Sequence, residues 1–67
     1  MIHVRLKEIL DERKLTQKQL SEMTNIKQAT ISEIANDQRS TINKKHLETI
    51  IDTLEITDIS EIIEIIK

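Results

Sequence analysis

The sequence contains no cysteine, glycine or proline, and no Phe, Tyr or Trp. Without cysteine, neither disulfides nor thiolate metal sites can stabilise the chain, so its stability must come from packed aliphatic side chains. Without aromatic rings it has no stacking platforms of the kind that single-strand nucleic-acid binders use. Without glycine and proline, turns and helix ends fall to short polar residues, of which the candidates are Asn25, Asn36, Asp37 and Asn43.

The chain also has no long apolar run. No stretch approaches the roughly 18 apolar residues of a membrane span, and residues 1–10 are too charged for a signal peptide. We therefore expect a cytoplasmic protein. A length of 67 residues leaves room for one domain, residues 1–67, and none for a separate sensor domain.

Charge is unevenly distributed along the chain, although the net charge is only −2. Residues 1–45 carry nine Lys and Arg against six acidic residues, a balance of +3, whereas residues 46–67 carry one against six, a balance of −5. The net charge alone speaks against a nucleic-acid-binding protein. The distribution suits a protein that offers one face to phosphate, with chance asymmetry as the alternative.

Apolar residues recur at helical spacing in four segments, which predict helices over about 4–13, 17–23, 28–35 and 43–54. Thr16 and Gln19 match a capping box at the start of the second helix, and Asn43 can cap the fourth. Near the end, Thr57 and Asp58 can cap a further turn or two.

The isoleucine-rich C-terminal segment, residues 62–66, has no clear period and fits either a helix or a strand. Its β-branched residues favour a strand, and Ile2 to Val4 offers another short β-prone segment with which it could pair. Both readings stay open at the level of the sequence.

The second and third helices are joined by only a few residues around Asn25, which is the connection length of a helix-turn-helix. Close crossing of two helices requires a small residue on the first, an apolar residue on each, and a turn residue that tolerates positive φ. These demands are met by Ser21, by Leu20 with Ile31, and by Asn25. The sequence therefore predicts a helix-turn-helix within residues 16–36.

Residues 15–21 (LTQKQLS) and 25–34 (NIKQATISEI) resemble the Cro/repressor-type helix-turn-helix family, also called XRE. The first helix, the fourth helix and the ending from Leu54 to Ile63 also fall where that family has them. The resemblance implies an all-α, five-helix, lambda-repressor-like DNA-binding domain whose third helix enters the major groove. A short pairing of N- and C-terminal strands is compatible with this fold. One departure is Lys27, which stands at a helix cap where Ser or Thr is customary.

The same resemblance implies two groups of DNA-contacting side chains. Base edges would be read by Lys27, Gln28, Ala29, Ser32 and Glu33. Phosphates would be held by Gln17, Lys18, Thr30, Arg39, Ser40, Thr41 and Lys44. Gln28 leads the first group, because its amide can donate and accept together, as the N6/N7 edge of adenine requires. Glu33 is the exception: a carboxylate in the groove repels phosphate unless it accepts from a cytosine amine or pairs with a cation, and an ordinary surface contact explains it equally well.

The sequence gives little support to an enzymatic function. His3 and His46 lie far apart in sequence, and the chain shows no catalytic triad, paired carboxylates or phosphate-cradling glycines. We expect no catalysis, no metal and no cofactor.

The function that the sequence favours is that of a sequence-specific transcriptional regulator on double-stranded DNA, similar to small Cro-like repressors of bacteria and their mobile elements. One recognition helix reads only a few base pairs, so we expect a homodimer on a pseudo-palindromic operator. The isoleucine-rich residues 59–66 would form the interface unless they complete the monomer core. The alternative is a helical protein-interaction module or antitoxin-like partner, favoured by the acidic tail and the isoleucines. A regulatory protein partner fits either reading.

Overall fold

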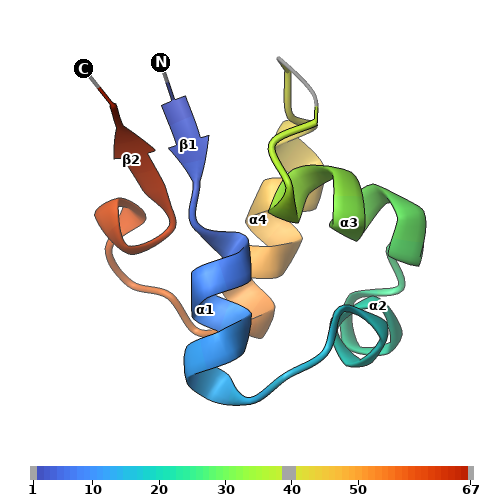
Figure 1. The fold of residues 1–67 in the computed structure, drawn as a ribbon. Coiled ribbons are helices and arrows are strands. Elements are labelled where there is room, and N and C mark those ends of the chain that lie inside the picture. Colours follow the sequence, from blue (N-terminus) through green and yellow to red (C-terminus); the bar gives the residue numbers. More distant parts are fainter. Residues whose placement is uncertain (1, 39–40, 67) are drawn as a thin grey trace.

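The computed structural model describes residues 2–38 and 41–66. Within these residues the chain forms four α-helices, one turn of 3-10 helix and a two-stranded sheet (Figure 1). In chain order the elements are β1 (Ile2–Val4), α1 (Leu6–Arg13), α2 (Gln17–Thr24), α3 (Gln28–Ala35), α4 (Lys44–Thr53), the 3-10 turn η1 (Ile59–Glu61) and β2 (Ile63–Ile65). No helix in the described part of the chain has the length and apolar character needed to cross a bilayer.

The helix ends follow the expected side-chain chemistry at several points. Thr16 and Gln19 form the reciprocal capping box at the start of α2, with bonds of 3.0 and 2.8 Å. The Asn43 side chain caps α4 by accepting from the backbone N–H of Lys45 at 2.8 Å. Asn25 and Asp37 both adopt left-handed backbone, with φ of 61° and 52°. Short polar residues therefore occupy the capping and left-handed positions that glycine often takes in other proteins.

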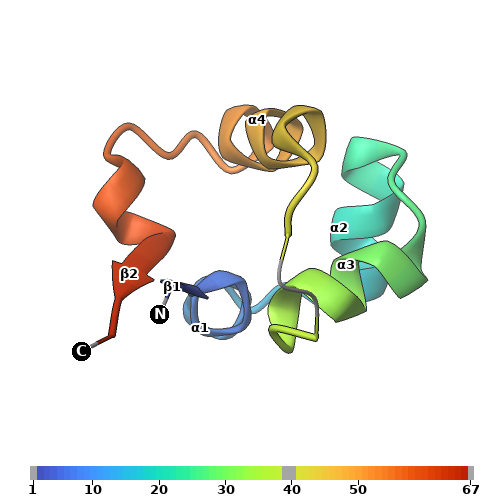
Figure 2. The ribbon, with the colours of Figure 1, turned by 90° about the horizontal axis from the view of Figure 1, so that it is seen from above.

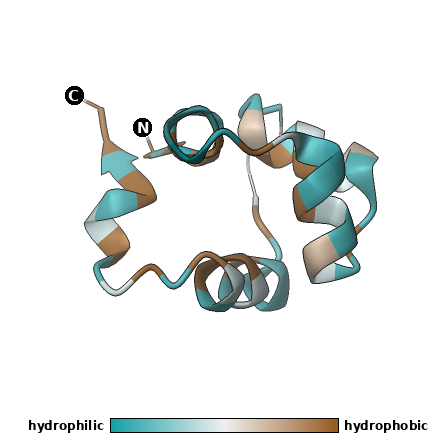
Figure 3. Cartoon of the chain, turned by 90° about the horizontal axis from the view of Figure 1, so that it is seen from below, coloured by the Kyte–Doolittle hydropathy of each residue, from teal (hydrophilic) through white to brown (hydrophobic). Residues whose placement is uncertain are grey.

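One aliphatic core joins all the helices. Its fully buried side chains are Leu6, Leu20, Ile31, Ile50, Leu54 and Ile62. Each such side chain contributes roughly 1.5–3 kcal/mol relative to an exposed one. In Figure 3 the hydrophobic stretches of α4 face the centre of the molecule, as its apolar stripe predicts. On α2 the apolar side chain of Met23 is 52% exposed, whereas the neighbouring Thr24 is buried.

The C-terminal end differs from the five-helix fold expected from the resemblance. After α4 the described chain makes only the 3-10 turn η1, capped by Asp58, and then the strand β2. β2 pairs antiparallel with β1, with Ile2 opposite Ile65 and His3 opposite Glu64. The prediction of a fifth α-helix is therefore wrong for the described residues, whereas the pairing of N- and C-terminal strands that the sequence left open is confirmed. The physical reason is that β-branched residues are placed beside a second β-prone segment, which offers hydrogen-bond partners to them.

The pairing also explains why α1 begins at Leu6 and not near residue 4: Ile2 to Val4 are used as a strand. The backbone N–H of Arg5 donates to the carbonyl of Ile62 at 2.6 Å and closes the ribbon where α1 begins. Both views place β1 and β2, the first and last elements of the described chain, side by side (Figures 1 and 2). The small sheet thus lies beside the start of α1 and next to the end of α3.

Candidate nucleic-acid interface

The turn between α2 and α3 is held by two side chains of α2 and by the backbone of Asn25. The Ser21 hydroxyl donates to the carbonyl of Ile26. The buried Thr24 hydroxyl donates to the carbonyl of Leu20 at 2.7 Å and accepts from the N–H of Ile26 at 3.3 Å. Asn25 makes the reversal with positive φ and donates its N–H to the carbonyl of Ser21 at 2.8 Å. This network fixes the direction in which α3 leaves the turn.

The start of α3 presents the first candidate base readers. Lys27 is the N-cap residue and makes no side-chain cap hydrogen bond, so the unusual residue leaves this cap without its customary side-chain acceptor. Gln28 is the first residue of the helix. Lys27, Gln28 and Ala29 are all exposed. The structure thus leaves these three side chains free to meet a ligand at one end of α3.

The other two candidate readers are less accessible. Ser32 is half-buried, and its hydroxyl accepts from the side chain of Asn36 at 3.3 Å. Glu33 is also half-buried, and its Oε2 atom is shielded from solvent. Glu33 lines a hollow of about 140 Å³ together with Ile2 and Val4 of β1. It therefore lies on the side of α3 that faces the sheet, and its assignment to DNA stays a prediction.

The candidate phosphate-binding residues fall at the helix starts and the approach to α4. Gln17, half-buried, and Lys18, exposed, open α2, and exposed Lys44 opens α4. Thr30 and Thr41 line one shallow hollow of about 110 Å³, so the structure brings α3 and this loop together. Arg39 and Ser40 lie outside the described residues. The two groups of candidates remain predictions with respect to DNA.

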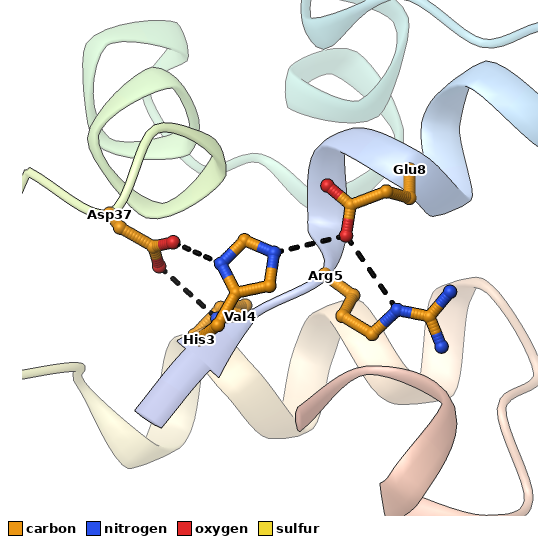
Figure 4. A network of polar contacts seen from close by, with 5 residues as sticks. All are labelled: His3, Val4, Arg5, Glu8 and Asp37. Carbon is orange, nitrogen blue, oxygen red and sulfur yellow. Dashed lines mark hydrogen bonds and ion pairs between the residues drawn. The ribbon is translucent and has the colours of Figure 1, made fainter. Parts of the chain in front are cut away.

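Sequence reasoning missed one polar cluster beside the end of α3 (Figure 4). The His3 ring is hydrogen-bonded through Nδ1 to Asp37 Oδ2 and through Nε2 to Glu8 Oε2, the latter at 3.0 Å. The backbone N–H of Val4 donates to the second oxygen of Asp37 at 3.1 Å. Arg5 Nε lies 3.6 Å from the same Glu8 oxygen. No sequence pattern links His3 with a residue 34 positions away, so only the fold reveals the cluster.

The cluster shifts the titration of its members. Hydrogen bonds to Asp37 and then Glu8 raise the pKa of the His3 imidazole above its usual value. Partial burial acts to raise the pKa of Asp37, but hydrogen bonds from the Val4 N–H and from His3 outweigh it and hold that pKa below its usual value. Both shifts favour the charged forms, an imidazolium facing carboxylates. Among the described residues, no group of three His, Asp or Glu is arranged to hold a metal ion.

Comparison with known proteins adds one finding. A family model described as Cro/C1-type HTH DNA-binding domain matches residues 5–67. The match includes α1, both helices of the helix-turn-helix, α4 and β2, and begins just after β1. Neither a curated protein nor a solved structure matches the chain.

Proposed function

The chain belongs to the Cro/C1-type HTH DNA-binding domains, and on that premise we propose that it is a sequence-specific transcriptional regulator, a small Cro-like repressor of bacterial or phage origin acting in the cytoplasm. Its α3 reads the major groove of double-stranded DNA. The observation that carries this proposal is Gln28, exposed at the first position of a helix that the α2–α3 turn holds firmly.

Gln28 supplies the base contact in this proposal. Its amide offers a donor and an acceptor in one plane, which matches the N7 and N6 groups of adenine. Lys27 and Ala29 flank it, the first suited to phosphate or guanine and the second to a thymine methyl group. The N–H groups at the start of α2, next to Gln17, favour a phosphate beside that helix.

The proposed regulator acts as a homodimer whose contact is the β1–β2 ribbon. The structure divides the C-terminal isoleucines into two sets. Ile62 is buried and Ile63 is half-buried against the core. Ile65 is 72% exposed and lies opposite Ile2, which is 65% exposed. This exposed cross-strand pair is apolar surface available for a second copy of the chain, because neither side chain packs into the core.

Selection of bound sequences from a random DNA pool tests the function. We expect an enriched short motif, arranged as two half-sites about one helical turn apart. Gln28→Ala should weaken binding to that motif by about 5- to 150-fold, which corresponds to roughly 1–3 kcal/mol for a bidentate contact, and should relax the preference at one base position. Lys44→Ala should weaken binding to all sequences and reduce the salt slope by about one.

Lys7→Ala is the matched control, because Lys7 is an exposed lysine on α1, away from the helix-turn-helix. It should leave both the motif and the salt slope unchanged. A pool without an enriched motif, or a motif insensitive to Gln28→Ala, contradicts the proposed reader. A protein-interaction module is the second candidate, supported by the exposed Ile2 and Ile65 pair. Docking through these residues would be nearly independent of salt, whereas binding through several phosphates weakens steeply as salt rises.

A further inference from the structure

The C-terminal end of α3 is connected to β1 through the side chain of Asp37. Asp37 lies one residue beyond Asn36, the C-cap of α3, and its backbone N–H donates to the carbonyl of Ile34 at 3.3 Å. The next N–H, of Gln38, returns to the carbonyl of Glu33 at 3.0 Å. The backbone of Asp37 is therefore hydrogen-bonded to the last turn of α3, while its carboxylate bonds to Val4 and His3 of β1 (Figure 4).

Apolar packing between these two elements is incomplete. A hollow of about 140 Å³ lies between them, lined by Val4 and Ile2 on one side and by Ile34 and Glu33 on the other. Close-packed side chains would fix the distance between the elements by themselves, but a hollow does not. The Asp37 carboxylate is thus a principal connection between the end of α3 and the sheet.

We propose that His3 is a positioning residue for DNA binding, which holds Asp37 and so fixes the end of α3 against β1 in its protonated form and releases it when neutral. This inference rests on the proposed function. A protonated imidazole donates from both nitrogens and satisfies both Asp37 and Glu8. A neutral imidazole has one N–H, so one of the two carboxylates then meets a lone pair.

The surroundings of His3 are predominantly acidic. In the described part of the chain, charged groups face it from α1, from the turn after α3 and from β2, namely Glu8 with Arg5, Asp37, and Glu64 opposite it in the ladder. Three carboxylates against one guanidinium favour the imidazolium. The state in which α3 is held therefore extends to a higher pH than a solvated histidine would allow.

The test is DNA affinity between pH 6 and pH 8 at constant ionic strength, in a His46→Gln background because His46 is the second histidine of the sequence. With His3 present, the dissociation constant should rise about five-fold across this range, the lower end of common coupling between sites. His3→Gln should flatten the profile. Asp37→Asn should also flatten it and weaken binding at pH 6 by a similar factor, since His3 still titrates but has lost the carboxylate through which it acts.

Asp37→Asn separates positioning from simple charge. Removing a negative charge near DNA strengthens binding if only long-range electrostatics matter, whereas the proposal expects weaker binding. Glu64→Gln is the matched control, because it also removes a carboxylate beside His3 but leaves the Asp37 bonds intact, so the pH response should persist. Circular dichroism at each pH verifies that every variant is folded.

The possible results separate a failure of the positioning role of His3 from a failure of the proposed function. Salt-sensitive binding with the same pH profile in the parent and in His3→Gln overturns the positioning role and leaves the proposed function standing. Tighter binding by Asp37→Asn does the same. Absence of DNA binding at every pH overturns the proposed function, and the inference with it.

Discussion

The hydroxyl of Ser21 donates a hydrogen bond to the backbone carbonyl of Ile26, so a side chain of α2 closes the turn from which α3 departs. A small residue is needed here for the two helices to approach, and serine adds a bond that alanine cannot make. Ser21→Ala should therefore lower the free energy of unfolding by about 1 kcal/mol, the usual net worth of one such bond. Urea denaturation measures the change. Ser60→Ala is the control, because its hydroxyl bond to Asp58 is exposed, and an equal loss in both variants would contradict the closing role.

Substitutions of Asn25 test the importance of left-handed backbone in the turn between α2 and α3. Its φ of 61° is a region that residues with a Cβ enter at a cost of about 1 kcal/mol, although asparagine tolerates it better than most. Asn25→Ala should therefore destabilise the fold by about 1 kcal/mol, while Asn25→Gly should remain within about 0.5 kcal/mol of the parent. Asn36, with φ of −100°, is the comparison: Asn36→Ala should have little effect. Thermal denaturation of the four proteins gives the ranking, and similar losses for Asn25→Ala and Asn25→Gly would exclude a backbone cause.

These turns show how far the sequence goes in predicting the fold. Asn25 and Asn43 could be assigned because a short polar side chain is a local signal, and the bounds of α3 follow from its apolar spacing. Lys14 and Glu55 also adopt positive φ, at 56° and 55°, yet long charged side chains carry no such signal. The fifth helix was implied by the family resemblance and is wrong for the described residues, whereas the β-branched residues at both ends had already indicated the β1–β2 pairing.

The candidate site could likewise be predicted from the sequence only in part. Lys27, Gln28 and Ala29 are exposed, as the base-reading role implied by the family resemblance requires. Glu33 is only half-exposed, since the sheet and the approach to α4 lie against that side of α3. The bond from His3 to Asp37 joins residues brought together by the sheet register and the last turn of α3, neither of which is a local property.

Thr24 provides a test of the buried polar contact in the helix-turn-helix. Its hydroxyl is the acceptor for the N–H of Ile26, and valine has the same shape without it. Thr24→Val should lower the free energy of unfolding by about 1–3 kcal/mol, because the N–H of Ile26 loses a partner away from water. Thr49→Val, which removes a hydroxyl bond to the carbonyl of Lys45 on α4, is the matched control and should cost less. Chemical denaturation compares them; equal stability of parent and Thr24→Val would contradict the role given to this hydroxyl.

The His3 and Asp37 pair predicts a pH optimum of stability. The folded pKa of His3 is raised, so its contribution is complete below its usual value of 6.5 and is lost as pH rises through the folded pKa. The folded pKa of Asp37 is lowered, so its contribution is present above 3.8 and is lost as pH falls through the folded pKa. The midpoint of thermal unfolding should therefore be highest between about pH 4 and pH 6.5 and decline on both sides.

Substitutions identify which residue causes the decline in stability on each side of that pH optimum. His3→Gln should remove the decline above pH 6.5, and Asp37→Asn should weaken both limbs, because it removes one titrating group and the partner of the other. His46→Gln leaves this network intact and should retain the shape. A decline on the alkaline side that persists in His3→Gln would show that another group causes it.

The exposed pair of Ile2 and Ile65 supplies the last prediction, which concerns the proposed dimer. The two side chains lie opposite each other on the ribbon and are 65% and 72% exposed, so a charge at Ile65 should perturb an interface without perturbing the core. In sedimentation at micromolar concentrations we expect a dimer for the parent and a monomer for Ile65→Lys, since desolvating an unpaired ammonium opposes association. Met23→Lys changes a similarly apolar, 52% exposed residue on α2 and should leave the dimer intact. If both variants sediment as the parent does, or if a monomeric parent binds single half-sites tightly, the ribbon is not the contact between subunits.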